Sequence, residues 1–140
     1  MLNAYFFYRI SHQLYSWKVP VFPSIVKLFC FLLYNSSIPF QCQLGKGTRF
    51  AYGGIGVVLH KRIIMGKNCV VGTNVTVGGR SGHYEVPVLG DNVYIASGAK
   101  VLGPITIGDN VVIGANAVVI KDVPDNCTVV GIPAKIIKRT

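Results

Sequence analysis

The chain has 140 residues and an unusual charge balance, with 14 Lys and Arg against 5 Asp and Glu, a formal net charge of +9. The length predicts one compact unit. The positive excess favours an anionic partner, such as a phosphorylated cofactor, an acidic glycan or a membrane surface. Because the basic residues are scattered from Arg9 to Arg139, without a dense run or a recognisable nucleic-acid module, the pattern argues against nucleic-acid binding.

Two apolar segments open the chain. The first, residues 3–17, carries a helical stripe made of Phe7, Ile10, Leu14 and Trp17. His12 faces away from this stripe and is expected to be a solvated surface residue. After a proline-containing break at residues 20–23, Ser24 is the predicted N-cap of a second helix that runs to about Tyr34.

We interpret residues 1–40 as an N-terminal helical cap and residues 41–140 as a repeat domain. The second helix is too short to cross a bilayer, which takes about 20 residues. Two readings of the helices stay open. They cover the open end of the repeat domain or a neighbouring subunit, or they form a hairpin in the membrane interface with Arg9, Lys18 and Lys27 near lipid headgroups.

Residues 89–124 repeat with a period of six. A branched aliphatic residue opens each unit, and a second small or branched residue follows four positions later. The openers are Leu89, Ile95, Val101, Ile107, Ile113 and Val119, and the second set is Val93, Ala99, Ile105, Val111, Ala117 and Val123. Neither a helix nor a simple strand keeps an inward position every sixth residue. The pattern therefore predicts a mainly β coil of three short strands per turn, in which each coil buries its core by stacking on the next.

This repeat resembles the hexapeptide-repeat acyltransferases. The resemblance covers roughly residues 44–138 and rests on Val-Pro-Val-Leu-Gly-Asp-Asn-Val-Tyr-Ile-Ala-Ser-Gly-Ala, on Ile-Gly-Asp-Asn-Val-Val-Ile-Gly-Ala-Asn-Ala-Val-Val and on Gly-Ile-Pro-Ala-Lys. It implies a left-handed parallel β-helix with a short N-terminal helical segment. It also implies a homotrimer with sites at the subunit interfaces and acetyl-CoA as co-substrate.

The repeat is interrupted twice. Segment 56–64 slips the register and places His60 at the slip. From Gly78 to Val88 the pattern fails again, and glycines surround His83 where an aliphatic residue would belong. We predict an extruded loop there.

Transfer of an acyl group from a thioester to a hydroxyl needs a base and donors for an oxyanion. Histidine has a suitable pKa, about 6.5, which makes His83 the first candidate for the base and His60 the second. Glu85 is the one carboxylate in the loop and would orient His83 if the loop turns tightly, although a backbone carbonyl serves equally well. Gly78 and Gly79 are predicted to offer amides to the oxyanion.

The resemblance adds binding residues. It places His83 against the acetyl-CoA thioester, and it carries the CoA groove over to Ser97, Ala115, Lys121 and Lys135. Tyr52 and, in the loop, Arg80 and Tyr84 are predicted to contact the acceptor.

The sequence also departs from the serine acetyltransferases of this family. These enzymes carry an Asp-His pair before a Gly-Ile-Val-Val-like strand, where this chain has Ala51, Tyr52 and Gly53. Their N-terminal helical domain is also longer than the roughly 40 residues present here. Both departures weaken serine as the acceptor, and His60 is open to sharing the role of base.

The remaining acidic and sulfur-containing residues are read as structural. The aspartates at corners or at the end of the array are Asp91, Asp109, Asp122 and Asp125. Cys30, Cys42, Cys69 and Cys127 have no C-x-x-C or zinc spacing, which predicts free buried thiols, a reducing cytoplasmic location and no metal site. We see no secretory signal. If the two helices form a membrane hairpin, the protein is expected at the inner face of the membrane.

Our main interpretation is an acetyl-CoA-dependent O-acetyltransferase acting on a sugar hydroxyl of a surface polysaccharide or its precursor. The alternative is a short serine O-acetyltransferase. A non-catalytic β-helix scaffold is a reading from another class. A zinc hydratase of the γ-carbonic-anhydrase kind needs three histidines, and the repeat domain has two, His60 and His83.

Overall fold

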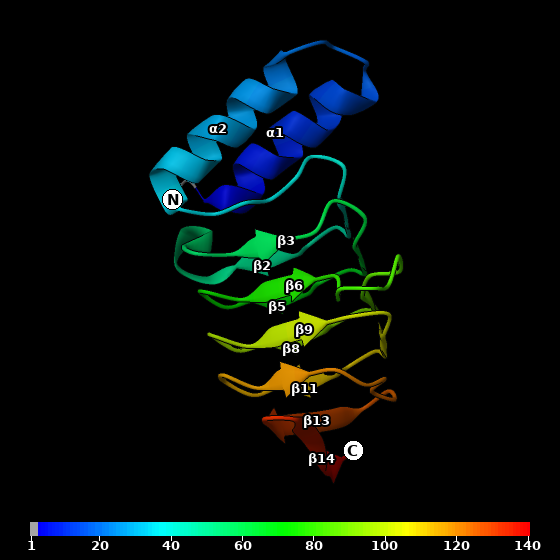
Figure 1. Cartoon of the computed structure of the whole chain (residues 1–140). Coiled ribbons are helices and arrows are strands. Elements are labelled where there is room, and N and C mark those ends of the chain that lie inside the picture. Colours follow the sequence, from blue (N-terminus) through cyan, green and yellow to red (C-terminus); the bar gives the residue numbers. More distant parts are fainter. Residues whose placement is uncertain (1–2) are drawn as a thin grey trace.

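The computed structural model describes residues 3–140 as a stack of triangular β coils with two helices at its N-terminal end (Figure 1). Short parallel strands form three faces of the stack. Face A contains β3 (Val58–Leu59), β6 (Thr76–Gly78), β9 (Lys100–Leu102) and β12 (Val118–Val119). Face B contains β1 (Gln43–Leu44), β4 (Ile64–Met65), β7 (Val88–Leu89) and β10 (Thr106–Ile107). Face C contains β2 (Arg49–Phe50), β5 (Val70–Val71), β8 (Tyr94–Ile95), β11 (Val112–Ile113), β13 (Cys127–Gly131) and the antiparallel β14 (Ala134–Arg139).

The chain visits face B, face C and face A in turn, so every coil has a B–C, a C–A and an A–B edge. The predicted inward positions line the axis: the opening residues Leu89 to Val119 and the second set Val93 to Val123 are all buried. Asn92, Asn110 and Asn116 adopt positive φ at corners, as does Gly98. The predicted mainly β, left-handed parallel β-helix with a short helical segment is confirmed.

A ladder of acidic and amide side chains holds the B–C edge together. The carboxylates of Asp91, Asp109 and Asp125 each accept a bond from a backbone N–H of the preceding coil, at 2.7–2.8 Å. Asn92 donates to Asn110, and Asn110 donates to Asn126. At the A–B edge, Asp122 accepts a hydrogen bond from the Thr106 amide at 2.8 Å. The structural reading of the four aspartates is therefore borne out by their contacts.

Helix α1 (Ala4–Ser16) covers the open N-terminal end of the stack, and α2 (Phe22–Tyr34) packs on α1. Ala4 and Tyr8 are buried against the first coil. The Tyr8 hydroxyl donates to the Cys42 carbonyl at 2.5 Å and accepts from the Leu44 amide at 3.2 Å. Burial raises the pKa of Tyr8 to about 12, so its hydroxyl keeps the proton that it donates.

The stripe of α1 is divided, because Phe7 packs against the core whereas Ile10 and Trp17 are exposed. Two sequence expectations about the helices are wrong. His12 is half-buried, with its Nδ1 2.6 Å from the Phe40 carbonyl oxygen, instead of lying free in solvent. Helix α2 begins at Phe22 after Val21, so Ser24 is not its N-cap.

The predicted register slip at residues 56–64 is also misplaced. Strands β3 and β4 keep the six-residue spacing through this segment, with Leu59 and Met65 both buried. The irregular segment lies before it, at the 3₁₀ turn η1 (Ala51–Gly54), where Tyr52 and both glycines adopt positive φ. His60 therefore occupies an ordinary corner.

Within residues 3–140, no helix has the length and apolarity needed to cross a membrane. The four cysteines are buried and free, as predicted.

Candidate active site

The A–B edge carries two of the three histidines, His60 and His83. Here each coil turns from face A to face B, and the corner residues are 60–62, 79–87, 103–105 and 120–122. Strand β3 pairs with β6 so that the His60 amide donates to the Val77 carbonyl at 2.9 Å. This pairing places His60 next to Gly78, where the second corner begins.

The corner at residues 79–87 is expanded into the predicted loop. Val77 and Leu89 are twelve residues apart, whereas the equivalent Leu59 and Met65 are six apart. The loop extends beyond the outline of the coils in Figure 1. Gly82 adopts φ +84° with open space around it, and Val86 is buried where the chain returns.

Arg62 joins the two parts of this edge. Its guanidinium lies 4.0 Å from the centre of the Tyr84 ring and donates a hydrogen bond to the Tyr84 carbonyl. Its backbone N–H donates to Nδ1 of His60 at 3.1 Å. One residue thus holds the loop with its side chain and the histidine with its backbone.

Sequence analysis did not select Arg62. The sequence did contain a signal for Arg62. One full coil contains eighteen residues, so Arg62 is stacked next to Arg80, at the start of the loop. The misplaced register slip hid that correspondence.

His60 is held as a neutral imidazole. Partial burial and then the positive charges of Arg62 and Lys61 lower the pKa of His60 from its ordinary value. Since Nδ1 accepts the bond from the Arg62 amide, the neutral ring carries its proton on Nε2. His60 therefore presents an N–H donor and keeps that donor at neutral pH.

His83 lies exposed on the loop, and its backbone N–H closes a turn on the Arg80 carbonyl at 3.1 Å. Within residues 3–140, no hydrogen bond or ion pair joins Glu85 to His83, although both side chains are exposed. The base role of His83 and the orienting role of Glu85 remain predictions.

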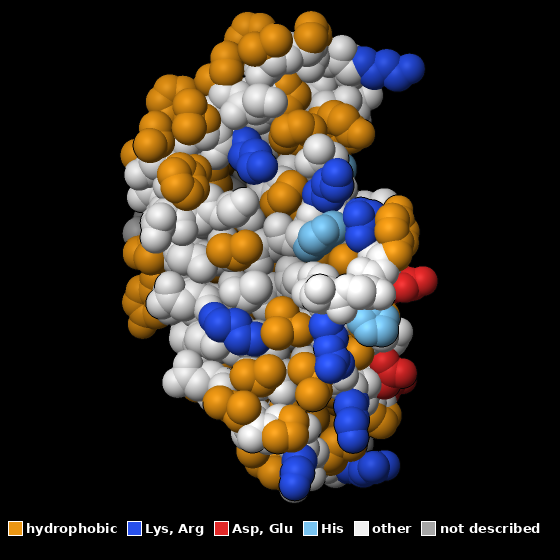
Figure 2. All heavy atoms as spheres, in the orientation of Figure 1, with side chains coloured by type: hydrophobic (Ala, Val, Ile, Leu, Met, Phe, Trp, Pro, Cys, Tyr) orange, Lys and Arg blue, Asp and Glu red, His pale blue; other side chains and the backbone are white. Residues whose placement is uncertain are grey.

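Two glycines and two basic side chains complete the edge. Gly79 is exposed, and its amide makes no hydrogen bond in the described part of the chain. The Arg80 side chain passes over Gly103, where an added Cβ would lie 3.5 Å from Arg80 Cβ and Cδ. Lys121 is exposed at the corner of the last coil. Figure 2 shows Lys, Arg and His side chains gathered along this side of the stack.

The structure does not bring every predicted residue to this edge. Tyr52, Ser97 and Ala115 precede β3, β9 and β12, so they lie at the C–A edge, across face A from His60. Lys135 lies in β14, the outermost strand of face C. A site that uses both edges needs two chains side by side.

Among the described residues there is no group of three or more His, Cys, Asp or Glu side chains placed to hold a metal ion.

Comparison with known proteins decides the family. The family described as bacterial transferase hexapeptide (six repeats) matches residues 87–121. A serine acetyltransferase of Synechococcus elongatus is 43% identical over 136 residues, which cover 95% of this chain and 55% of the relative. The chain belongs to the hexapeptide-repeat acyltransferases.

Solved structures of this family superimpose on the helices as well as on the coils. The Neisseria gonorrhoeae serine acetyltransferase in complex with serine matches with a TM-score of 0.87 at 35% identity, covering 94% of this chain and 54% of that one. The Brucella abortus enzyme in complex with coenzyme A matches with a TM-score of 0.91 at 31% identity, covering 98% and 55%. This chain spans little more than half the length of these relatives.

These relatives overturn our main interpretation of the acceptor. The curated relatives at 37–43% identity are named serine acetyltransferases, and none of these names mentions a sugar. The prediction of a sugar hydroxyl on a surface polysaccharide was wrong because it gave too much weight to the missing Asp-His pair and the short helical segment. The names of these relatives instead favour our alternative interpretation, a serine O-acetyltransferase.

Proposed function

We propose that this chain is a serine O-acetyltransferase that transfers the acetyl group of acetyl-CoA to the hydroxyl of L-serine. The similarity to serine acetyltransferases over 94–99% of the chain carries this proposal. The A–B edge supports it, because a hydroxyl acceptor needs a base and an oxyanion donor in one place.

In this proposal the imidazole of His83 takes the proton of the serine hydroxyl as the hydroxyl oxygen attacks the thioester carbonyl. The free Gly79 amide and the Nε2–H of His60 are donors for the oxyanion of the tetrahedral intermediate. Collapse of the intermediate breaks the C–S bond, and the leaving thiolate of CoA recovers the proton from His83. No covalent acyl-enzyme is needed, since a thiolate is already a good leaving group.

Besides His83, the charged and aromatic side chains of the loop are Arg80, Tyr84 and Glu85, and we propose that they contact serine. Arg80 would pair with the serine carboxylate, because a guanidinium binds carboxylates in a two-pronged geometry. Arg62 would fix the loop by holding Tyr84.

We further propose a homotrimer in which the A–B edge of one subunit faces the C–A edge of the next. This arrangement would bring Ser97 and Ala115 of one chain to the loop of another, as neither lies near it within one chain. Small residues there would admit the pantetheine arm, and Lys121 and Lys135 would meet the phosphates of CoA. Exposed apolar side chains on the faces, such as Tyr94 and Val112, favour burial against another subunit.

In this assignment residues 41–140 carry the site and residues 1–40 form the cap. The free, buried state of all four cysteines favours a reducing, cytoplasmic location.

The test is thiol release from acetyl-CoA by the purified chain with L-serine, with O-acetylserine identified by mass spectrometry. We expect release with L-serine and background release with D-serine or with a panel of sugars. The variant His60→Ala/His83→Ala should release no thiol above background. Release that is independent of serine, or equal in this variant, would contradict the proposal and favour a non-catalytic scaffold.

A further inference from the structure

The two helices expose a large apolar surface, which we call the hairpin surface. It lies at the N-terminal end of the stack, where Figure 2 shows apolar side chains over both helices. Its large exposed side chains are Phe6, Ile10, Trp17, Val21, Phe22, Ile25, Leu28, Phe29, Phe31, Leu32 and Leu33. Trp17 and Leu32 are each 67% exposed. A surface of this kind marks an interaction site.

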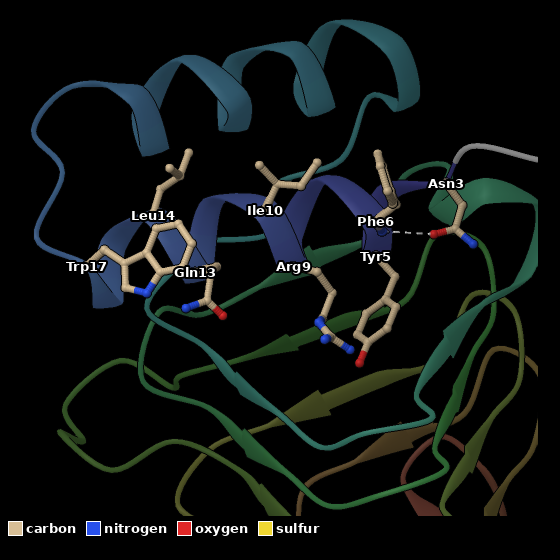
Figure 3. Close-up of a pocket in the computed structure, with 8 residues that line it drawn as sticks. All are labelled: Asn3, Tyr5, Phe6, Arg9, Ile10, Gln13, Leu14 and Trp17. Atoms are coloured by element: carbon tan, nitrogen blue, oxygen red, sulfur yellow. Dashed lines mark hydrogen bonds between the residues drawn. The ribbon is translucent and has the colours of Figure 1, made fainter.

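An open groove of about 830 Å³ runs along α1 within this surface (Figure 3). Phe6, Ile10 and Leu14 point from α1 toward α2, while Tyr5 and Arg9 point toward the coils. Three residues of the stripe recognised in the sequence, Ile10, Leu14 and Trp17, therefore line the groove. Arg9 lies at the border of the groove, and its charged side chain is exposed to solvent.

Charge distinguishes the hairpin surface from the rest of the molecule. The chain has no Asp or Glu before Glu85, whereas nine of its Lys and Arg residues precede that position. Arg9, Lys18 and Lys27 lie on or beside the two helices, and no acidic side chain accompanies them. The surface is therefore apolar and purely cationic.

We propose that the hairpin surface docks on an anionic lipid bilayer. Each helix has thirteen residues, too few to span a bilayer but enough to lie in the interface with apolar side chains among the acyl chains. Lys and Arg at the border would meet anionic headgroups, and Trp17 at the tip of the hairpin would sit at headgroup depth. In a parallel trimer all three hairpins lie at one end of the stack, so the subunits would bind together.

Charge also argues against a second copy of the chain as the occupant. Face-to-face association of two hairpin surfaces would bring together two surfaces that each carry Arg9, Lys18 and Lys27 without an acidic side chain. Like charges brought together in a desolvated interface are unfavourable. An anionic bilayer neutralises them.

The single tryptophan of the chain provides the test. The full chain is mixed with vesicles of phosphatidylcholine alone or with about one third phosphatidylglycerol, and the emission of Trp17 and the flotation of the protein are measured. We expect a blue shift and flotation with the anionic vesicles, at least about tenfold weaker with phosphatidylcholine or at high salt.

Variants separate the apolar and the ionic contributions. Leu28→Ser/Leu32→Ser should lower vesicle binding by about 100-fold, and Lys18→Gln/Lys27→Gln by about tenfold. The matched controls Ile137→Ser and Lys138→Gln change exposed residues of β14 at the far end and should bind as the wild type does. Equal binding by Leu28→Ser/Leu32→Ser and the wild type would overturn the proposal. So would a blue shift that depends on protein concentration without lipid, which would assign the surface to a second copy.

Discussion

The A–B and B–C edges are made by the same chain turning the same kind of corner, yet they use their polar side chains differently. On the B–C edge, Asp91 and Asp109 bond to backbone amides of the neighbouring coil, and asparagines bond to one another. On the A–B edge, Asp122 also accepts from a backbone amide, but His83, Arg80 and Lys121 are exposed, and their side chains make no such bonds among the described residues.

This contrast separates structure from function within one repeat. A polar group that is satisfied inside the protein stabilises the stack, and a polar group that faces solvent is available to a ligand. His60 and Arg62 stand between the two, because they are tied to each other and to the loop.

The largest effect is expected for His83→Ala. Removal of a general base lowers turnover by about 10²–10⁴-fold, while the thermal midpoint should stay unchanged because the side chain is exposed. Steady-state thiol release with L-serine and a melting curve measure both. Ser81→Ala, in the same loop, is the control, and an active His83→Ala enzyme would move the base role to His60.

Two glycines test the packing difference between the edges. Gly66→Ala on the B–C edge would put a Cβ 2.6 Å from the Gly90 carbonyl carbon, and such a backbone collision should cost about 3 kcal/mol of unfolding free energy. Gly82→Ala meets nothing within 4 Å and suffers only from φ +84°, a cost of about 1 kcal/mol. Urea unfolding compares them, and equal destabilisation would contradict the assignment of the loop as an open corner.

Asp109→Ala tests the carboxylate ladder. It leaves the Asp91 amide without its acceptor, and we expect a loss of about 1 kcal/mol of unfolding free energy. Turnover of the folded enzyme should match the wild type. Asp109→Asn keeps an acceptor oxygen and should lose less, so a larger loss in Asp109→Asn than in Asp109→Ala would argue against the ladder.

The smallest expected effect is a shift in the titration of His60. Burial and the Arg62 charge lower the pKa of His60, so its imidazole should titrate below about 6.5. Arg62→Gln removes one cation and should raise this pKa toward that value, which moves any loss of activity caused by His60 protonation to higher pH. NMR titration of the three histidines, assigned with His60→Gln, measures the change. A pKa that falls in Arg62→Gln would contradict the sign of the interaction.

The coil itself could be predicted because its core is local in sequence. One inward residue every six positions, and another four places on, fixes which side chains reach the axis. The insertion at Ala51–Gly54 escaped because residues 50–55 fill six places and were counted as a regular unit, so the slip seemed to begin at Gly56. The true inward residues are Val57 and Leu59.

The candidate site was predicted in its parts but not in its connections. The loop around His83 could be predicted because the aliphatic residues of the repeat are absent between Gly78 and Val88. The contacts of Arg62 with Tyr84 join residues twenty-two positions apart, and only stacking of the coils brings them together. The acceptor was beyond composition and spacing, because serine and a sugar hydroxyl present the same chemistry to an imidazole.

One assay tests the central claim most directly, by comparing the two edges in the same measurement. Thiol release from acetyl-CoA with L-serine is recorded for His60→Ala/His83→Ala and for Asp91→Asn/Asp109→Asn, at a temperature where both are folded. We predict that the histidine variant is inactive although it loses only the bond from the Arg62 amide to His60, and that the aspartate variant is active but melts earlier than the histidine variant. An active histidine variant beside an inactive, folded aspartate variant would contradict the assignment of the A–B edge as the active site.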